Sequence, residues 1–317
     1  MSLPVKVSII VPVYNVEEYL SKCLDSCIGQ TLYDIEIICI NDGSTDSSLQ
    51  LLHKYAAVDP RIKVIDQKNS GVAVARNAGL SAANGNWIMF LDPDDYLSKN
   101  ACERVWLESQ YEKTDIVIFG SEIFPAIPEA DSWYWQALST PTRRFYEFIP
   151  YILFNMPGGH PFVWNKAFSA NLLNVLQVDF NEEFHLGEDL IFQFEVMPFA
   201  SNFAVISDRL YNYRWYREGS MMSRAGKNLE YKMGVHVDMI KTITKYWHEE
   251  GLLELYGGEF FAWLLEFIVP DLHGKTLKNR TMLANKLLQT INMYGLKDYS
   301  EDMKDDSKRL VKMLEKI

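Results

Sequence analysis

The chain has 317 residues, of which 48% are hydrophobic and 23% are charged, a composition typical of a folded protein with enough chain for one large domain or two. Its formal net charge of −11 argues against general nucleic-acid binding, because that affinity depends on clustered lysine and arginine. The four cysteines are too few and too irregularly spaced for a disulfide framework or a zinc site. We therefore expect a cytoplasmic protein.

The first 120 residues alternate between strand and helix patterns. Apolar and β-branched runs predict buried strands, and apolar residues at helical spacing predict the helices between them. This alternation is typical of an α/β fold with a largely parallel sheet flanked by helices. The predicted strands are Val7–Val13, Ile35–Ile40, Ile62–Ile65, Trp87–Leu91 and Asp115–Phe119. The predicted helices begin after Asn15 and at Ser44 or Thr45, and span Val72–Ala83 and Ala101–Tyr111.

The start of the first helix has a specific signal. Asn15 is predicted to cap this helix, and Glu18, three residues further on, would complete a capping box.

The regular alternation stops after Gly120. The following stretch contains Pro125, Pro128 and Trp133, which predicts an irregular connection or a lid. Three short elements are then expected: a helix near Asn165–Leu173, a helix near Asp189–Met197 and a strand near Leu210–Trp215. From about residue 226 the chain has helical patterns, so we divide it into segments 1–120, 121–225 and 226–317.

The C-terminal segment contains an apolar stretch, Phe260–Val269, which is interrupted by Glu266 and is expected to stop at Pro270. It is shorter than the roughly 20 residues that cross a bilayer. The N-terminus lacks the charged and apolar regions of a signal peptide. We expect no membrane anchor. The apolar face of this stretch, together with Trp247, is predicted to be core, with contact to the inner face of a membrane or to a second subunit as the alternatives.

Polar clusters follow the predicted strands, and the most informative one contains Asp92, Asp94 and Asp95. Ligands of open α/β sheets bind at the carboxyl ends of the strands. Crowded carboxylates repel one another unless a cation compensates, and hard divalent cations take oxygen ligands from carboxylates and substrate phosphates. A metal site for a phosphate-bearing substrate is one interpretation. A polar turn in which Asp92 or Asp95 caps the next helix is the other.

Two further residues are candidates for the same cleft. Asp42 leaves a buried strand and is placed to accept hydrogen bonds from a base or ribose, although Asp42-Gly43-Ser44 is also an ordinary turn and helix cap. Arg76 lies in a helix of small residues, so its side chain is expected to reach the cleft. An ion pair with one of the aspartates is the alternative role for Arg76.

These motifs, in this order, resemble family 2 glycosyltransferases of the GT-A fold, of the bacterial type. The resemblance is close over roughly the first 120 residues and looser beyond them. It rests on Val11–Asn15, Asn41–Ser44, Asn69–Gly71 with Arg76, Asn77 and Gly79, Phe90–Asp95, Val163–Phe168, Gly187–Phe192 and Tyr211–Arg214.

The resemblance implies an inverting, metal-dependent transfer of a sugar from a nucleotide diphosphate, with a UDP-sugar as the expected donor. Segment 1–120 would bind the nucleotide-sugar, 121–225 the acceptor, and 226–317 would be a helical C-terminal region. The implied donor-binding residues are Pro12, Val13, Tyr14, Asn15, Asp42, Asn69, Arg76, Asp92 and Asp94. Asp94, with Asp92, would hold Mn²⁺ or Mg²⁺. The residues implied for the acceptor or diphosphate side are Asp95, Trp164, Lys166, Glu188 and Arg214.

Asp189 matches the position of the family's general base. Taken alone, Glu188-Asp189 is an acidic first helical turn. A helix N-terminus lowers the pKa of a carboxyl group and burial raises it, so the sequence leaves the pKa of Asp189 open. His160, His185 and Arg217 are weaker candidates for contacts with substrate.

The acceptor implied by the resemblance is a growing polysaccharide, a lipid-linked oligosaccharide or a protein. Two other functions stay open from the sequence: a sugar-nucleotide pyrophosphorylase and a catalytically inactive nucleotide-sugar-binding module. A pyrophosphorylase would normally carry a glycine-rich phosphate loop after its first strand, where this chain has Val-Pro-Val-Tyr-Asn. The C-terminal helices are a candidate surface for a homo-oligomer.

Overall fold

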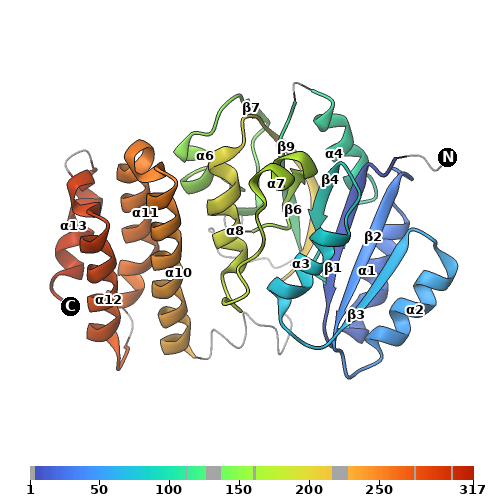
Figure 1. Cartoon of the computed structure of the whole chain (residues 1–317), viewed down its shortest axis with the longest axis horizontal. Coiled ribbons are helices and arrows are strands. Elements are labelled where there is room, and N and C mark those ends of the chain that lie inside the picture. Colours follow the sequence, from blue (N-terminus) through green and yellow to red (C-terminus); the bar gives the residue numbers. More distant parts are fainter. Residues whose placement is uncertain are drawn as a thin grey trace. The chain divides into compact units, whose positions relative to one another are not determined.

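A computed structural model describes residues 4–111, 113–125, 137–159, 162–215, 228–274, 276–300 and 303–317 (Figure 1). These residues divide into two compact units. The first contains the residues up to Phe148 and from Met156 to Trp215, and the second contains Ile149–Asn155 and the residues after Trp215. Pro128, Trp133, His160 and Arg217 lie outside the described residues, so the proposed lid stays a prediction.

In the first unit, nine strands of the described residues form one sheet. Their order is β3-β2-β1-β4-β8-β6-β9-β5, with β7 paired to β9. The bounds are Val7–Val13 (β1), Ile35–Asp42 (β2), Ile62–Gln67 (β3), Trp87–Phe90 (β4), Tyr96–Leu97 (β5), Ile116–Phe124 (β6), Arg143–Phe145 (β7), Lys166–Ser169 (β8) and Phe203–Arg214 (β9). The four strands β1 to β4 are mutually parallel, and β8 runs antiparallel between β4 and β6. This confirms the predicted α/β class, and strands from segments 1–120 and 121–225 share the sheet.

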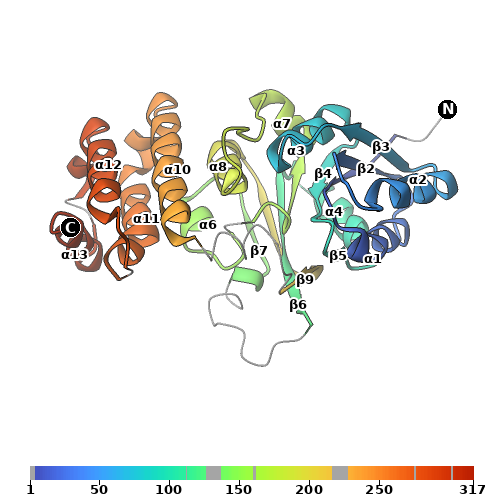
Figure 2. The ribbon, with the colours of Figure 1, turned by 90° about the horizontal axis from the view of Figure 1, so that it is seen from below.

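Helices cover both faces of this sheet (Figure 2). The helices of the first unit are Glu17–Ile28 (α1), Ser48–Val58 (α2), Val72–Ala82 (α3), Ala101–Ser109 (α4), Ala170–Leu176 (α7) and Glu188–Val196 (α8), followed by the 3-10 turn Met197–Phe199 (η1). One face of β1, with Ile9 and Val11, packs on Leu20 and Cys23 of α1. The opposite face packs on α3, where a Cβ added to Gly79 would come within 2.4 Å of the Ile10 side chain. The sheet is therefore buried on both faces, as the β-branched strands require.

The helix expected near Asn165–Leu173 is wrong over its first half. Lys166–Ser169 forms β8, and α7 begins only at Ala170. Ala167 pairs with Met89 of β4 and with Val117 of β6. Backbone hydrogen bonding to strands on both sides therefore decides the conformation of this short segment, which carries no alternating pattern of its own.

The predicted capping role of Asn15 is also wrong. The N-cap of α1 is Val16, and Asn15 has a left-handed backbone with φ of 48°. The Asn15 side-chain oxygen instead accepts hydrogen bonds from the backbone N–H groups of Thr45 (2.8 Å) and Asp46 (3.4 Å). In return, the Ser48 hydroxyl accepts from the N–H of Val16 at 3.0 Å. The loops after β1 and β2 are therefore joined by reciprocal hydrogen bonds.

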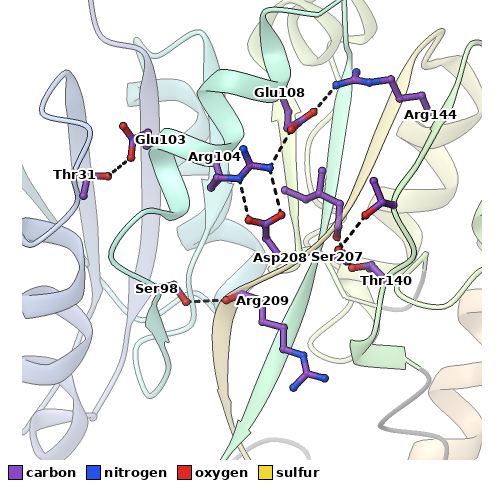
Figure 3. A network of polar contacts seen from close by, with 12 residues as sticks. Thr31, Ser98, Glu103, Arg104, Glu108, Thr140, Arg144, Ser207, Asp208 and Arg209 are labelled. Atoms are coloured by element: carbon purple, nitrogen blue, oxygen red, sulfur yellow. Dashed lines mark hydrogen bonds and ion pairs between the residues drawn. The ribbon is translucent and has the colours of Figure 1, made fainter.

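A polar network fixes α4 to strands β7 and β9 of the sheet (Figure 3). Arg104 of α4 donates to Glu108 at 3.1 Å and to Asp208 of β9 at 2.9 Å. Arg144 of β7 forms an ion pair with the same Glu108. One carboxylate thus connects the helix to an edge strand.

The second unit is helical and has its own core. Its elements are Pro150–Phe154 (α6), Leu229–Glu249 (α10), Leu252–Gly274 (α11), Arg280–Met293 (α12), Leu296–Ser300 (η2) and Asp305–Leu314 (α13). Trp247 is fully buried and stacks on Phe260 with 4.8 Å between ring centroids. Pro270 ends the apolar stretch of the sequence but not the helix, because α11 continues through Pro270 to Gly274. Within the described ranges, no helix combines the length and apolarity needed to cross a membrane.

Candidate active site

The polar clusters found in the sequence meet at one edge of the sheet. β1 lies between β2 and β4 and runs parallel to both, so Tyr14, Asp42 and Asp92 follow neighbouring strands at their carboxyl ends. Loops at this edge of a parallel sheet carry the ligand sites of α/β proteins. Pro12 and Val13 are buried within β1, whereas Tyr14 is 46% exposed at its end.

Asp42 is 4% exposed and holds the loop that leads into α3. One carboxylate oxygen accepts hydrogen bonds from the Gln67 side chain and the Ser70 N–H, both at 2.8 Å. The other accepts from the Gly71 N–H at 2.9 Å. The Asn69 side chain donates to the carbonyl oxygen of Asp42 at 2.9 Å. Asp42 and Asn69, both predicted to contact the donor, are therefore also the connection between the β2 and α3 loops.

Arg76 is the central charge of the site. It is 4% exposed and donates to Glu188 at 2.9 Å and to Asp92 at 3.2 Å. Its guanidinium carbon also lies 5.2 Å from the ring centroid of Phe180. The alternative of an ion pair with an aspartate thus describes the structure, and the same contacts place Arg76 between the aspartate loop and the N-terminus of α8.

The three aspartates after β4 have different environments. The Asp92 side chain is 29% exposed. Asp95 is 3% exposed and accepts hydrogen bonds from the Tyr211 hydroxyl at 2.7 Å and from the Arg214 N–H at 2.6 Å. Burial and the neighbouring Asp94 and Asp92 raise the pKa of Asp95 well above its ordinary value. Asp95 therefore joins the loop to β9.

Arg214 also contacts the aspartate loop. Its Nε donates to the carbonyl oxygen of Asp94 at 3.0 Å, and its guanidinium carbon lies 4.4 Å from the ring centroid of Tyr19. The Asp94 carboxyl group is partly exposed. The contacts with Arg214 thus fix the loop, while Asp92 and Asp94 stay partly exposed.

Tyr211 is a residue that sequence reasoning missed as part of the site. It is fully buried, its hydroxyl donates to Asp95, and the same oxygen accepts a hydrogen bond from the Asp92 N–H at 3.1 Å. Trp164 stacks on its ring with 4.4 Å between centroids. The only sequence signal was the aromatic strand Tyr211–Arg214, which does not reveal a partner more than 110 residues away.

Asp189 lies in the first turn of α8. The helix starts after Gly187, whose φ of 85° is a left-handed conformation that favours glycine. Burial raises the pKa of Asp189 to about 7, with the charge of Glu188 adding to this shift and that of Arg76 opposing it. A carboxylate with a pKa near neutrality suits proton abstraction at physiological pH.

Lys166 and Trp164, both predicted for the acceptor or diphosphate side, are buried. Lys166 is completely buried and donates to the carbonyl oxygen of Phe162 and to the side chain of Asn165, both at 2.7 Å. Burial lowers the pKa of Lys166 well below its ordinary value, although the charge of Asp189 opposes this shift. Trp164 is 3% exposed. Both side chains therefore pack behind the site surface.

The carboxylates after β4 are the candidates of this site for holding a metal ion. Within the described ranges, no group of three or more Asp, Glu, His or Cys side chains is arranged to hold an ion. Asp92 and Asp94 are partly exposed and lie two residues apart in one loop. This arrangement fits a Mg²⁺-type ion that takes its remaining ligands from substrate phosphates and water.

A sheet with acidic loops at its carboxyl edge and a carboxylate at a helix N-terminus has the arrangement expected of a glycosyltransferase of the GT-A fold. The chain belongs to glycosyl transferase family 2, whose family model matches residues 8–170. It is therefore an enzyme of the glycosyltransferase class.

Relatives with curated names agree with this assignment. The putative glycosyltransferase EpsH of Bacillus subtilis is 32% identical over 263 residues, which cover 82% of this chain and 74% of that protein. The poly(ribitol-phosphate) beta-glucosyltransferase of Bacillus spizizenii is 31% identical over 75% of this chain, but the match spans only 37% of that protein.

Solved structures support the fold. S. aureus TarS, residues 1–349 in complex with UDP-GlcNAc, has a TM-score of 0.61 and 21% identity, with 95% of this chain and 93% of that chain covered. The mannosyltransferase PcManGT of Pyrobaculum calidifontis, in complex with GDP-Man and Mn²⁺, has a TM-score of 0.53 and 14% identity, with 93% and 84% covered.

Proposed function

We propose that this chain transfers a sugar from a nucleotide diphosphate donor, in the first place a UDP-sugar, to an acceptor hydroxyl in polysaccharide or glycoconjugate synthesis, with inversion at the anomeric carbon. The observation that carries the proposal is the position of Asp189. Arg76 connects Glu188, the neighbour of Asp189, to Asp92 at the donor edge. A candidate base therefore faces the candidate donor loop across a single buried arginine.

In this mechanism Asp189 accepts the proton of the acceptor hydroxyl. The acceptor oxygen attacks the anomeric carbon, the bond from that carbon to the diphosphate oxygen breaks, and the nucleoside diphosphate leaves with the bonding electron pair. A pKa of about 7 leaves Asp189 substantially ionised at neutral pH and basic enough to assist this step. One direct displacement inverts configuration.

Asp94, with Asp92, would hold Mn²⁺ or Mg²⁺, which neutralises charge on the leaving diphosphate. Tyr14 and Asn15 line the edge where the base and ribose would bind, and Asp42 and Asn69 fix the loop beside them. The UDP-GlcNAc bound to TarS and the Mn²⁺ bound to PcManGT support a nucleotide-sugar and a divalent ion for this chain. The family assignment favours transfer over pyrophosphorylase chemistry.

Calorimetric titration of nucleotide diphosphates and their sugars, with and without Mn²⁺, tests the donor site. We expect metal-dependent binding of one nucleotide by the wild type, its loss in Asp94→Ala, and no change in Asp306→Asn, a control whose carboxyl group is 90% exposed on α13. Absence of nucleotide binding under every condition would refute the donor site.

The base is tested separately. In Asp189→Asn, donor binding should persist. Donor hydrolysis, measured as release of the nucleoside diphosphate, should fall by two orders of magnitude or more, since general-base catalysis contributes about 10²–10⁴-fold. Unchanged hydrolysis in this variant would remove Asp189 from the mechanism. A wild-type protein that binds the donor but never releases nucleotide would be the inactive binding module.

A further inference from the structure

A hollow lies at the end of the sheet opposite to the candidate active site. It has a volume of about 760 Å³ and is bordered by the turn between α3 and β4, by the end of β8 and by α7. β4 begins at this hollow with Trp87, whereas Asp92 follows its opposite end. α3 likewise passes from Arg76 at the candidate active site to Leu80 at the hollow, one helical turn or about 6 Å further along its axis.

The turn that forms one wall is fixed by buried groups. Glu36, which is 2% exposed, accepts hydrogen bonds from the Asn84 N–H at 2.6 Å and the Ser8 hydroxyl at 2.5 Å. The Ser8 oxygen accepts from the Gly85 N–H at 2.9 Å. The Ala170 N–H donates to the carbonyl oxygen of Asn86 at 2.9 Å, which joins this wall to α7. The hollow is therefore formed without a ligand, which lowers the cost of binding one.

The lining is polar and nearly uncharged. Among the described residues, Asp179 is the one charged residue that lines the hollow, and no lysine or arginine lines it. Amide side chains predominate, including those of Asn86, Asn171 and Asn174. In the described part of the chain, no intramolecular hydrogen bond is assigned to the side chains of Asn171 and Asn174. Each amide therefore offers two donor hydrogens and an acceptor oxygen to a ligand.

This chemistry complements hydroxyl groups that both donate and accept. It does not complement a phosphate or a uronate, because no lysine or arginine of the described chain lines the hollow and Asp179 would repel an anion. Another hollow, of about 420 Å³, lies beside Arg104 and Arg144. It is a weaker candidate for a binding site, since both guanidinium groups are already paired with Glu108 or Asp208 (Figure 3).

We propose that the hollow between the α3–β4 turn and α7 binds a neutral oligosaccharide, as an auxiliary site for the acceptor or product chain. The choice of a saccharide rests on the proposed transferase function. A chain held here and at the active site together gains effective concentration at the reacting end, so this site favours long acceptors over short ones. Its volume is within the range of about 300–1,000 Å³ that is typical of ligand pockets.

The test uses direct binding, without donor or metal. Neutral hexasaccharides of glucose, galactose and N-acetylglucosamine, and the anionic hexagalacturonate, are titrated and followed by calorimetry and saturation-transfer NMR. The variants are Asn171→Ala/Asn174→Ala, which removes the two amides, and Asn171→Trp, which fills the hollow. Asn292→Ala, an exposed asparagine on α12, is the matched control.

We expect at least one neutral hexasaccharide to bind with a millimolar Kd. The double variant and Asn171→Trp should bind it about tenfold more weakly or not at all, the size expected for one or two lost hydrogen bonds. Asn292→Ala should bind normally, and hexagalacturonate should not bind. The proposal is overturned if no neutral hexasaccharide binds the wild type, or if both hollow variants bind as the wild type does.

Nucleotide titration of the same variants distinguishes this outcome from failure of the proposed function. Normal donor binding with no saccharide binding overturns the auxiliary site alone. Saccharide binding that depends on Asn171 and Asn174, with no donor binding, overturns the donor site alone.

Discussion

Replacement of Arg76 should destabilise the first unit by several kcal/mol, and the loss should depend on whether Glu188 is charged. The Arg76–Glu188 pair has an N–O distance of 2.9 Å, with side chains 5% and 7% exposed. Removing one partner of a buried ion pair leaves an uncompensated charge, which costs about 3–5 kcal/mol. The pair with Asp92 contributes less, because that carboxyl group is 29% exposed and the distance is 3.2 Å.

These values set a double-mutant cycle. We expect Arg76→Met to lower the free energy of unfolding by about 4 kcal/mol. Glu188→Gln should lower it by about 2 kcal/mol, the value of a hydrogen bond to a charged group. The double variant should lose about 2 kcal/mol less than the sum of these, because methionine then faces a neutral amide instead of an unpaired carboxylate.

Hydrogen exchange of peptides from β1 and β4 measures this free energy within the first unit, whatever the second unit does. Arg209→Met is the control within the first unit, since the side chains of the Arg209–Glu122 pair are 45% and 44% exposed and its loss should cost less than about 1 kcal/mol. The reasoning is refuted if the two losses add to within about 0.5 kcal/mol, or if Arg76→Met costs no more than Arg209→Met.

Three further predictions follow from the described contacts. The kcat/KM for donor hydrolysis should rise with pH and reach a plateau above an apparent pKa near 7, because the pKa of Asp189 is raised to about 7 and its ionised form is the base. A pH–rate profile without this rise would contradict the assignment of Asp189. Gly79→Ala should destabilise by about 1–3 kcal/mol because its Cβ would meet Ile10 at 2.4 Å, whereas Gly234→Ala in α10, with nothing within 4 Å, should stabilise by about 0.5–1 kcal/mol. Thermal unfolding of the pair checks the opposite signs. Lys166→Met should lower the free energy of unfolding by about 2 kcal/mol, since the Phe162 carbonyl and Asn165 lose a buried donor; urea unfolding equal to that of the wild type would exclude this role.

The parts of the fold that local pattern determines could be predicted from the sequence. β1 was predicted with its observed bounds because Val7–Val13 is a largely β-branched run. The apolar positions of α1, including Leu20 and Cys23, are buried as their spacing required. β8 was missed, because Lys166–Ser169 becomes a strand only through its two neighbours in the sheet.

In the candidate site, too, local motifs identify some residues but not the contacts between them. The aspartates and Asp189 were identified from ordered motifs, and their roles stay predictions. The Arg76–Glu188 and Tyr211–Asp95 contacts join residues 112 and 116 positions apart, and they left no periodic signal. The value of about 7 for the pKa of Asp189 depends on burial against these distant groups, which no local rule supplies.

The strand order has a consequence for synthesis on the ribosome. β1 to β4 are complete once Phe90 has emerged, but the strand that covers the outer edge of β4 is β8, some 76 residues later in the chain. Until then the nascent sheet presents an unpaired edge, and Arg76 lacks the Glu188 carboxylate, 112 residues further on. A chain truncated near residue 120 should therefore aggregate or recruit chaperones, so residues 1–120 are better studied within the whole first unit.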